Sequence, residues 1–238
     1  MEYKHEKRKG KGGNRNQQNG ARPVSSNQEI VFKWVPVKAE RISPKENKAL
    51  YEEYKEERPR MLRETVYNPD GTENKEGISR LRQAGLDDKA IFDVIAKGQT
   101  PNGFNYHHLF PRALSGGLAN GPIQIGDEQI TTLHDWRCMM PLPNSATNDI
   151  HGNVHQAMDQ RNGPMPANKG DKKTYYIAMP LTAEEYSMYK TNPQSVKAEL
   201  LIVSGRSFRT VDQRETEKVQ KKEMSAVDIA KLKMGNGR

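Results

Sequence analysis

Most of the histidines of this chain lie in one segment, which runs from Asn105 to Met158. Neutral imidazole is the commonest metal-binding side chain among the ionisable groups, and it also transfers protons near neutral pH. Because only one of the six histidines lies elsewhere, this concentration predicts a site that combines metal binding with acid–base chemistry. The histidines of the segment are His107, His108, His134, His151 and His155.

His151 and His155 have the spacing of two residues on one helix face. Side chains at positions i and i+4 of a helix are neighbours, so both imidazoles can reach one ion at about 2.0–2.1 Å. We expect Asn144 or Ser145 to cap this helix, and Gly152 to leave room for a metal or a phosphate between the two rings. The opposite, buried stripe is predicted from Ile150, Val154, Ala157 and Met158.

The dipeptide His107-His108 ends an aromatic segment and is expected on a strand. Adjacent residues on a strand point to opposite faces. One of these histidines can therefore face an ion while the other faces a substrate. The dipeptide thus predicts one metal ligand beside one general base.

The histidines belong to a longer motif, which reads Pro101-x-Gly103-Phe104, His107-His108-Leu109-x-Pro111, Gly116-Gly117, Met140-Pro141-Leu142-Pro143 and His151-x-x-x-His155. This motif resembles the HNH nucleases, also called ββα-metal or His-Me finger nucleases. The similarity is greatest to the versions that form C-terminal domains of bacterial polymorphic toxins and nuclease bacteriocins. It extends over residues 100–158 and implies an α+β fold, with a ββα-metal core embedded in a mixed α/β domain.

The resemblance implies a role for each histidine of the motif. His107, His151 and His155 would hold one divalent metal ion, for which Zn, Mg, Mn and Ni are the candidates, and His108 would be the general base. Three neutral imidazoles leave one coordination position open, as a catalytic site requires. That position suits a phosphate oxygen and the leaving 3′ oxygen, where a metal stabilises the developing charge.

One residue of the family pattern is missing. The family places an asparagine on the second strand, where its side chain orients the base, but that position falls near Cys138 and holds no asparagine. Either a backbone carbonyl or another side chain must then take this role. The candidate side chains are Asp135, Asn144 and Asn148.

Two arginines, Arg112 and Arg137, are predicted to contact the phosphate, because a planar guanidinium pairs well with a phosphodiester. The alternative for each is a solvated surface position. We expect His134 at the surface, and the alternatives are an extra metal ligand or a residue that supports a ligand. Cys138 is not expected to be a nucleophile, since no feature around it would lower the pKa of its thiol.

The composition favours a polyanionic partner. The formal net charge is +8, and residues 1–28 carry seven basic and two acidic side chains. Together with a mean hydropathy of −0.95, this predicts a disordered basic leader. The chain has one cysteine, no apolar run of about 20 residues and no apolar core of a signal peptide, so we expect no structural disulfide, no membrane segment and no signal peptide.

The sequence divides into four predicted segments. They are a leader (1–28), a strand and helices that pack on the core (29–98), the catalytic core (99–160) and a C-terminal α/β extension (161–238). Pro36 is expected to place the first strand at an edge or to end it, and Pro59 to stop the first helix near Glu57. The insertion 118–133 is expected to cover or shape the substrate cleft. Strands are expected over 29–37, 174–179 and 199–203, and helices over 44–57, 77–84, 87–97, 182–189 and 215–233.

We therefore expect a metal-dependent endonuclease that hydrolyses DNA with low sequence specificity. The resemblance also implies an antibacterial toxin with a cognate immunity protein, made in the bacterial cytoplasm and delivered by a specialised secretion system. RNA is the other possible substrate, because hydrolysis of a phosphodiester does not by itself distinguish ribose from deoxyribose. One alternative is a phage or mobile-element HNH endonuclease with sequence specificity, although no DNA-reading motif is recognisable. The other is a non-catalytic nucleic-acid-binding protein whose fold is stabilised by a zinc ion, although structural zinc sites favour several cysteines.

Overall fold

The computed structural model describes residues 28–116, 123–125 and 128–213. The predicted leader, apart from Gln28, and the helix predicted over 215–233 lie outside the described residues, as does part of the insertion 118–133. The described chain combines helices with antiparallel sheets, consistent with the predicted α+β class. None of its helices is long and apolar enough to cross a membrane.

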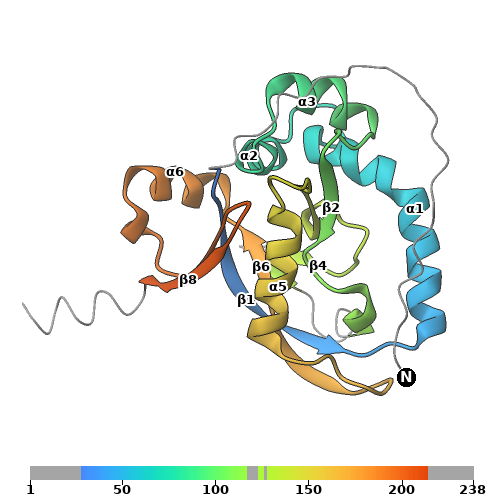
Figure 1. Cartoon of the computed structure of the whole chain (residues 1–238). Coiled ribbons are helices and arrows are strands. Elements are labelled where there is room, and N and C mark those ends of the chain that lie inside the picture. The colour runs from blue at the N-terminus through green and yellow to red at the C-terminus, as the bar shows by residue number, and fades with distance from the viewer. Residues whose placement is uncertain (1–27, 117–122, 126–127, 214–238) are drawn as a thin grey trace, which may run out of the picture.

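A four-stranded antiparallel sheet lies at the centre of the fold (Figure 1). Its β1 strand pairs with β6 over most of its length and with β7 over its first residues. The predicted segments 29–98 and 161–238 therefore contribute strands to one sheet. In sheet order the strands are β6 (Lys172–Pro180), β1 (Ile30–Glu40), β7 (Glu199–Val203) and β8 (Phe208–Asp212).

Pro36 lies inside β1, which continues to Glu40, so the expectation that this proline ends the strand is wrong. In the described chain, β1 is paired with β7 only as far as Lys33, and Pro36 faces Tyr176 of β6. A proline has no N–H to donate to a ladder, so it is tolerated where one side of the strand has no partner. Pro36 thus has the edge environment that was the other expectation.

A second antiparallel pair is followed along the chain by a helix. β2 (Phe104–His108) pairs with β5 (Met139–Pro143), and α5 (Ile150–Asn162) packs against both β5 and the central sheet. Figure 1 shows α5 against the sheet, with β2 on the side toward α1. The insertion contributes the short pair β3 (Ile123–Ile125) and β4 (Glu128–Ile130). The predicted apolar stripe of α5 is buried, as expected.

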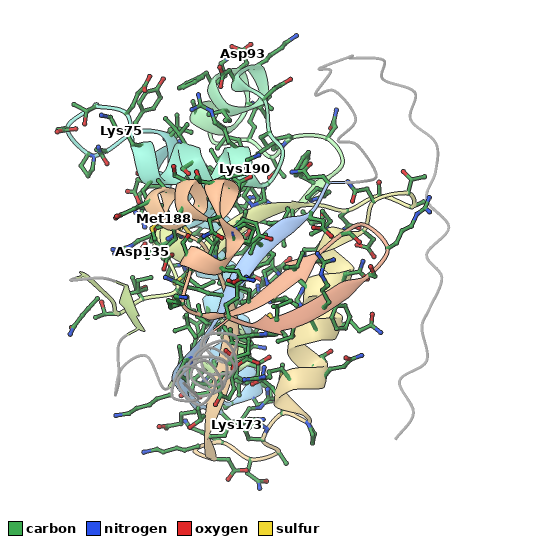
Figure 2. All side chains as sticks on the ribbon, turned by 90° about the vertical axis from the view of Figure 1, so that its left-hand side faces the viewer. Lys75, Asp93, Asp135, Lys173, Met188 and Lys190 are labelled. Atoms are coloured by element: carbon green, nitrogen blue, oxygen red, sulfur yellow. The ribbon has the colours of Figure 1, made fainter. Side chains whose placement is uncertain are left out.

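The remaining helices surround these sheets. Figure 2 shows Lys75 and Asp93, from the helices α2 and α3, at the opposite end of the molecule from Lys173 of β6. The α-helices are α1 (Pro44–Val66), α2 (Lys75–Gln83), α3 (Asp88–Asp93) and α6 (Ala183–Thr191). Short 3-10 helices are η1 (Ile95–Lys97), η2 (Arg112–Leu114), η3 (Trp136–Cys138) and η4 (Pro193–Ser195).

Helix α1 begins where the sequence predicts but ends later. Ser43 and Glu46 form a capping box in front of Pro44, yet the helix passes through Pro59 and ends at Val66. An interior proline costs a helix about 3 kcal/mol. Burying one large apolar side chain stabilises by about 1.5–3 kcal/mol, and several residues after the proline are buried. The burial of these side chains outweighs the cost of the proline, so the helix continues. The buried residues are Met61, Leu62 and Val66.

The helix predicted over 87–97 is divided into α3 and η1. Gly98 ends it with a φ of 78°, and its N–H donates a hydrogen bond to the carbonyl of Ile95. Only glycine adopts this left-handed conformation without strain. The chain is thereby turned into the loop that leads to β2.

Candidate metal centre

Three of the four histidines of the motif converge on one point. His107 comes from β2, and His151 and His155 come from one face of α5. Each offers a ring nitrogen, and these nitrogens all lie within 4.8 Å of one another. His107 is fully buried, His151 is half-buried and His155 is exposed. We call these residues the histidine trio.

The spacing within the trio fits a bound metal. The Nδ1 atom of His107 lies 3.3 Å from the Nε2 atom of His155. Two nitrogens bound to one ion at about 2.0–2.1 Å with a tetrahedral angle are about 3.3–3.4 Å apart. Hydrogen bonds of the N–H···O type are usually shorter, at about 2.7–3.2 Å. The separation therefore fits two ligands of one ion, and it is long for a hydrogen bond.

The surroundings of His107 also favour a metal. Its Nε2 atom is buried and has no hydrogen-bond partner among the described residues. The only hydrogen-bonding contact that the ring makes there is to His155. A buried polar ring with so few partners is costly. A metal bound at Nδ1 would give the ring one strong interaction, and Nε2 would still have no partner among the described residues.

The electrostatic environment keeps the trio neutral, as metal binding requires. Burial lowers the pKa of His107 well below its usual range, and His155 and His151 lower it further. Desolvation also lowers the pKa of His151. For His155, desolvation outweighs the opposite effect of Asp159 and Asp149, and its pKa is lowered too.

Helix α5 starts later than expected. Its N-cap is Asp149, whose side chain accepts a hydrogen bond of 2.8 Å from the Gly152 N–H, so the prediction of Asn144 or Ser145 is wrong. A Cβ atom at Gly152 would lie 2.3 Å from the Asp149 carboxylate. The space at Gly152 is therefore occupied by the capping side chain, and not by a site for metal or phosphate between the histidines.

His108, the expected base, lies beside the trio. It lines a cavity of about 340 Å³ together with His155 and Arg112. Burial, with a smaller effect of Arg112, lowers the pKa of His108 to about 3. The imidazole is therefore neutral at pH 7 and can accept a proton.

Helix α1 holds His108 in place. The rings of Tyr54 and His108 meet edge to face, with centroids 4.5 Å apart and an interplanar angle of 62°. Tyr54 is 7% exposed, so the contact is fixed inside the protein. Among the described residues, His108 has no hydrogen-bond partner that would orient it.

The three candidates for orienting the base lie elsewhere. The carboxylate of Asp135 is bound to Arg137. Asn144 is exposed, and the side chain of the buried Asn148 packs against Gly205. None of the three contacts His108 in the described structure, so the family asparagine has no replacement among them.

The two predicted phosphate contacts differ. Arg112 lines the cavity next to His108, and its guanidinium lies 4.6 Å from the ring centre of Tyr51. Arg137 forms an ion pair of 2.7 Å with Asp135 and lines neither cavity that borders the trio. Arg112 therefore lies beside His108 in a cavity, whereas the guanidinium of Arg137 is paired with a carboxylate.

The two remaining residues lie outside the trio. His134 is half-buried and not fully at the surface, and its Nε2 atom lies 3.3 Å from a carboxylate oxygen of Glu53. Cys138 is buried, and desolvation raises the pKa of its thiol to about 12. It therefore stays protonated and is not a nucleophile.

Sequence reasoning missed the contribution of α1, which it treated as a packing helix. Tyr54 and Arg58 line a second cavity, of about 680 Å³, that reaches His151. The available signal was the spacing of Tyr51, Tyr54 and Arg58, which places them on one helix face. Nothing in that spacing indicates which other element the face meets.

Comparison of the chain with protein-family models, with curated proteins and with solved structures found no match. The chemistry of this chain must therefore be argued from its own geometry. That geometry offers three neutral imidazoles suited to one metal ion, with a fourth imidazole and an arginine beside them in a cavity.

Proposed function

We propose that the chain is a metal-dependent endonuclease of the HNH type, which hydrolyses DNA phosphodiester bonds with low sequence specificity. One observation carries the proposal. The trio of His107, His151 and His155 converges within 4.8 Å, and His108 lies next to it in a cavity. A ligand set with three imidazoles leaves a position for substrate, and the exposed His155 leaves the trio open to solvent on one side.

The trio would hold the ion, and when bound the ion would polarise the phosphate and offset the charge that develops during the reaction. His108 accepts the proton of the attacking water, which bonds to phosphorus as the 3′ oxygen leaves. Arg112 binds a phosphate oxygen through its planar guanidinium. Tyr54 keeps the His108 ring turned into the cavity.

The partner class follows from charge and resemblance. A net charge of +8 suits a nucleic acid. DNA is the substrate we propose, and RNA is the comparison that an assay needs. The role as an antibacterial toxin, with a cognate immunity protein and a specialised secretion route, rests on the motif alone, and toxicity on expression in the bacterial cytoplasm is its test.

The proposal is tested by cleavage of plasmid DNA and of RNA with Zn, Mg, Mn or Ni, and with EDTA. We expect metal-dependent nicking of DNA. His108→Ala should reduce it by about 10²–10⁴-fold, the usual contribution of a general base, while the metal still binds. His134→Ala is the matched control, because it removes a histidine outside the trio. Undiminished nicking by His108→Ala would contradict the proposed mechanism.

A further inference from the structure

Two cavities border the histidine trio, one at His151 and the other at His155. The larger, of about 680 Å³, reaches His151. The smaller, of about 340 Å³, reaches His155 and His108. Tyr106 lines both cavities, so the two cavities adjoin at this residue. A ligand that extends beyond the trio in both directions would occupy both.

Each cavity is lined by one arginine. Arg58 belongs to α1, and Arg112, which belongs to η2, contacts α1. Arg112 lies in the smaller cavity, with its guanidinium over Tyr51. Arg58 lines the larger cavity. Its charge acts to lower the pKa of the Tyr54 hydroxyl, against the larger rise in that pKa that burial causes. Tyr51, Tyr54 and Arg58 share one face of α1. This helix face therefore spans both ends of the site.

Neither arginine is neutralised in the described chain. No carboxylate of the described residues lies within 4 Å of Arg58 or Arg112, whereas other arginines have such partners. The paired ones include Arg60, Arg82, Arg137 and Arg161. Arg112 is held over the ring of Tyr51, and Arg58 hydrogen-bonds with the side chain of Tyr54. A guanidinium that lines a cavity and has no carboxylate partner is suited to bind an anion.

From this arrangement we infer that a nucleic-acid strand crosses the trio from one cavity to the other, with Arg58 binding a phosphate that flanks the one held at Arg112. Arg58 is thus a substrate-binding residue, and the larger cavity is the subsite for the flanking nucleotide. This inference rests on the proposed function for the identity of the reaction, but the binding it describes does not require cleavage.

The first test measures binding in the inactive His108→Ala background, with a fluorescent DNA oligonucleotide and a salt titration. Each phosphate contact contributes about 0.9 to the slope of log K against log salt for duplex DNA, and about 0.7 for single strands. We expect Arg58→Gln to lower the slope by about one such contact and Arg58→Lys to restore most of it. Arg82→Gln, which removes one exposed charge from α2, is the matched control.

The second test uses a substrate without flanking phosphates, bis(p-nitrophenyl) phosphate. In the active protein, Arg58→Gln should lower kcat/KM on the oligonucleotide by about tenfold, the loss of one charged contact. It should leave hydrolysis of the small diester unchanged. Equal losses on both substrates, or an oligonucleotide affinity lowered no more than by Arg82→Gln, would overturn the inference.

The two tests separate this inference from the proposed function. If the wild-type chain binds the oligonucleotide through Arg58 and cleaves neither substrate, the nuclease proposal fails and the subsite stands. If the chain cleaves both substrates and Arg58→Gln has no effect, the subsite fails and the nuclease stands. Zinc binding by Arg58→Gln, equal to that of the unmodified chain, shows that the variant is folded.

Discussion

The ring of Tyr54 meets that of His108 edge to face, with the two centroids 4.5 Å apart. Tyr54 belongs to α1, and His108 is the last residue of β2. The contact joins a helix of the N-terminal part to the histidine segment. It places an aromatic ring against the proposed base, which contacts none of the three candidates for the orienting residue.

This contact predicts that the ring of Tyr54, and not its hydroxyl, keeps His108 in position. Tyr54→Phe should retain kcat, because it preserves the edge-to-face pair. Tyr54→Leu should lower kcat by about 2- to 10-fold, because the interaction energy of such an aromatic pair is about 0.5–1.5 kcal/mol. Steady-state kinetics on bis(p-nitrophenyl) phosphate measure the effect.

Metal affinity provides the control for this pair of variants. Both should bind zinc as the unmodified chain does, since Tyr54 is not a ligand. A Tyr54→Phe variant as slow as Tyr54→Leu would contradict positioning by the ring and assign the role to the hydroxyl.

Metal binding should stabilise the fold. An ion that binds only the native state adds about 2.7 kcal/mol when its concentration is 100 times the Kd. We expect zinc to raise Tm, measured by calorimetry, and EDTA to reverse the change. His155→Ala should remove this response, because it takes away the ligand 3.3 Å from His107, whereas His134→Ala should keep it. A zinc response of equal size in His155→Ala would exclude the trio as the site.

Metal affinity should resist mild acid. The pKa values of His107, His151 and His155 are all lowered, with desolvation as the main cause. Protons compete with the metal only as the pH approaches these lowered values, below the usual imidazole pKa of about 6.5. Zinc affinity, measured by competition with a chelating dye, should therefore change little from about pH 8 to about pH 6.5 and fall at lower pH. A loss that is already well under way at about pH 6.5, where an ordinary imidazole is half protonated, would show that the histidines titrate normally.

The start of α5 offers a test of stability. Alanine usually stabilises a helix by about 1 kcal/mol relative to glycine. At Gly152 the new Cβ would displace the Asp149 carboxylate and lose a cap that is worth about 1 kcal/mol. We therefore expect Gly152→Ala to leave the free energy of unfolding almost unchanged, as measured by urea denaturation.

A double-mutant cycle isolates the cause. Asp149→Ala alone should destabilise by about 1 kcal/mol. In that background Gly152→Ala should recover most of the loss, because no carboxylate remains to be displaced. Equal effects of Gly152→Ala with and without Asp149 would contradict the steric explanation.

Some features of this protein follow from the sequence by itself. The spacing of His151 and His155 places them on one helix face whatever surrounds the helix, because the period of a helix is local. The same holds for the capping box of Ser43 and Glu46 and for the turn at Gly98, since neighbours in the chain form these contacts. His107, as the third member of the trio, followed from the motif.

Other features depended on contacts between distant parts of the chain. Burial beyond Pro59 extended α1, and the cap of α5 is Asp149 in place of the predicted Asn144 or Ser145. The meeting of Tyr54 with His108 and the pairing of Arg137 with Asp135 were likewise set by packing. Such contacts depend on which surfaces the folded core brings together, and residue spacing along the chain does not contain that information.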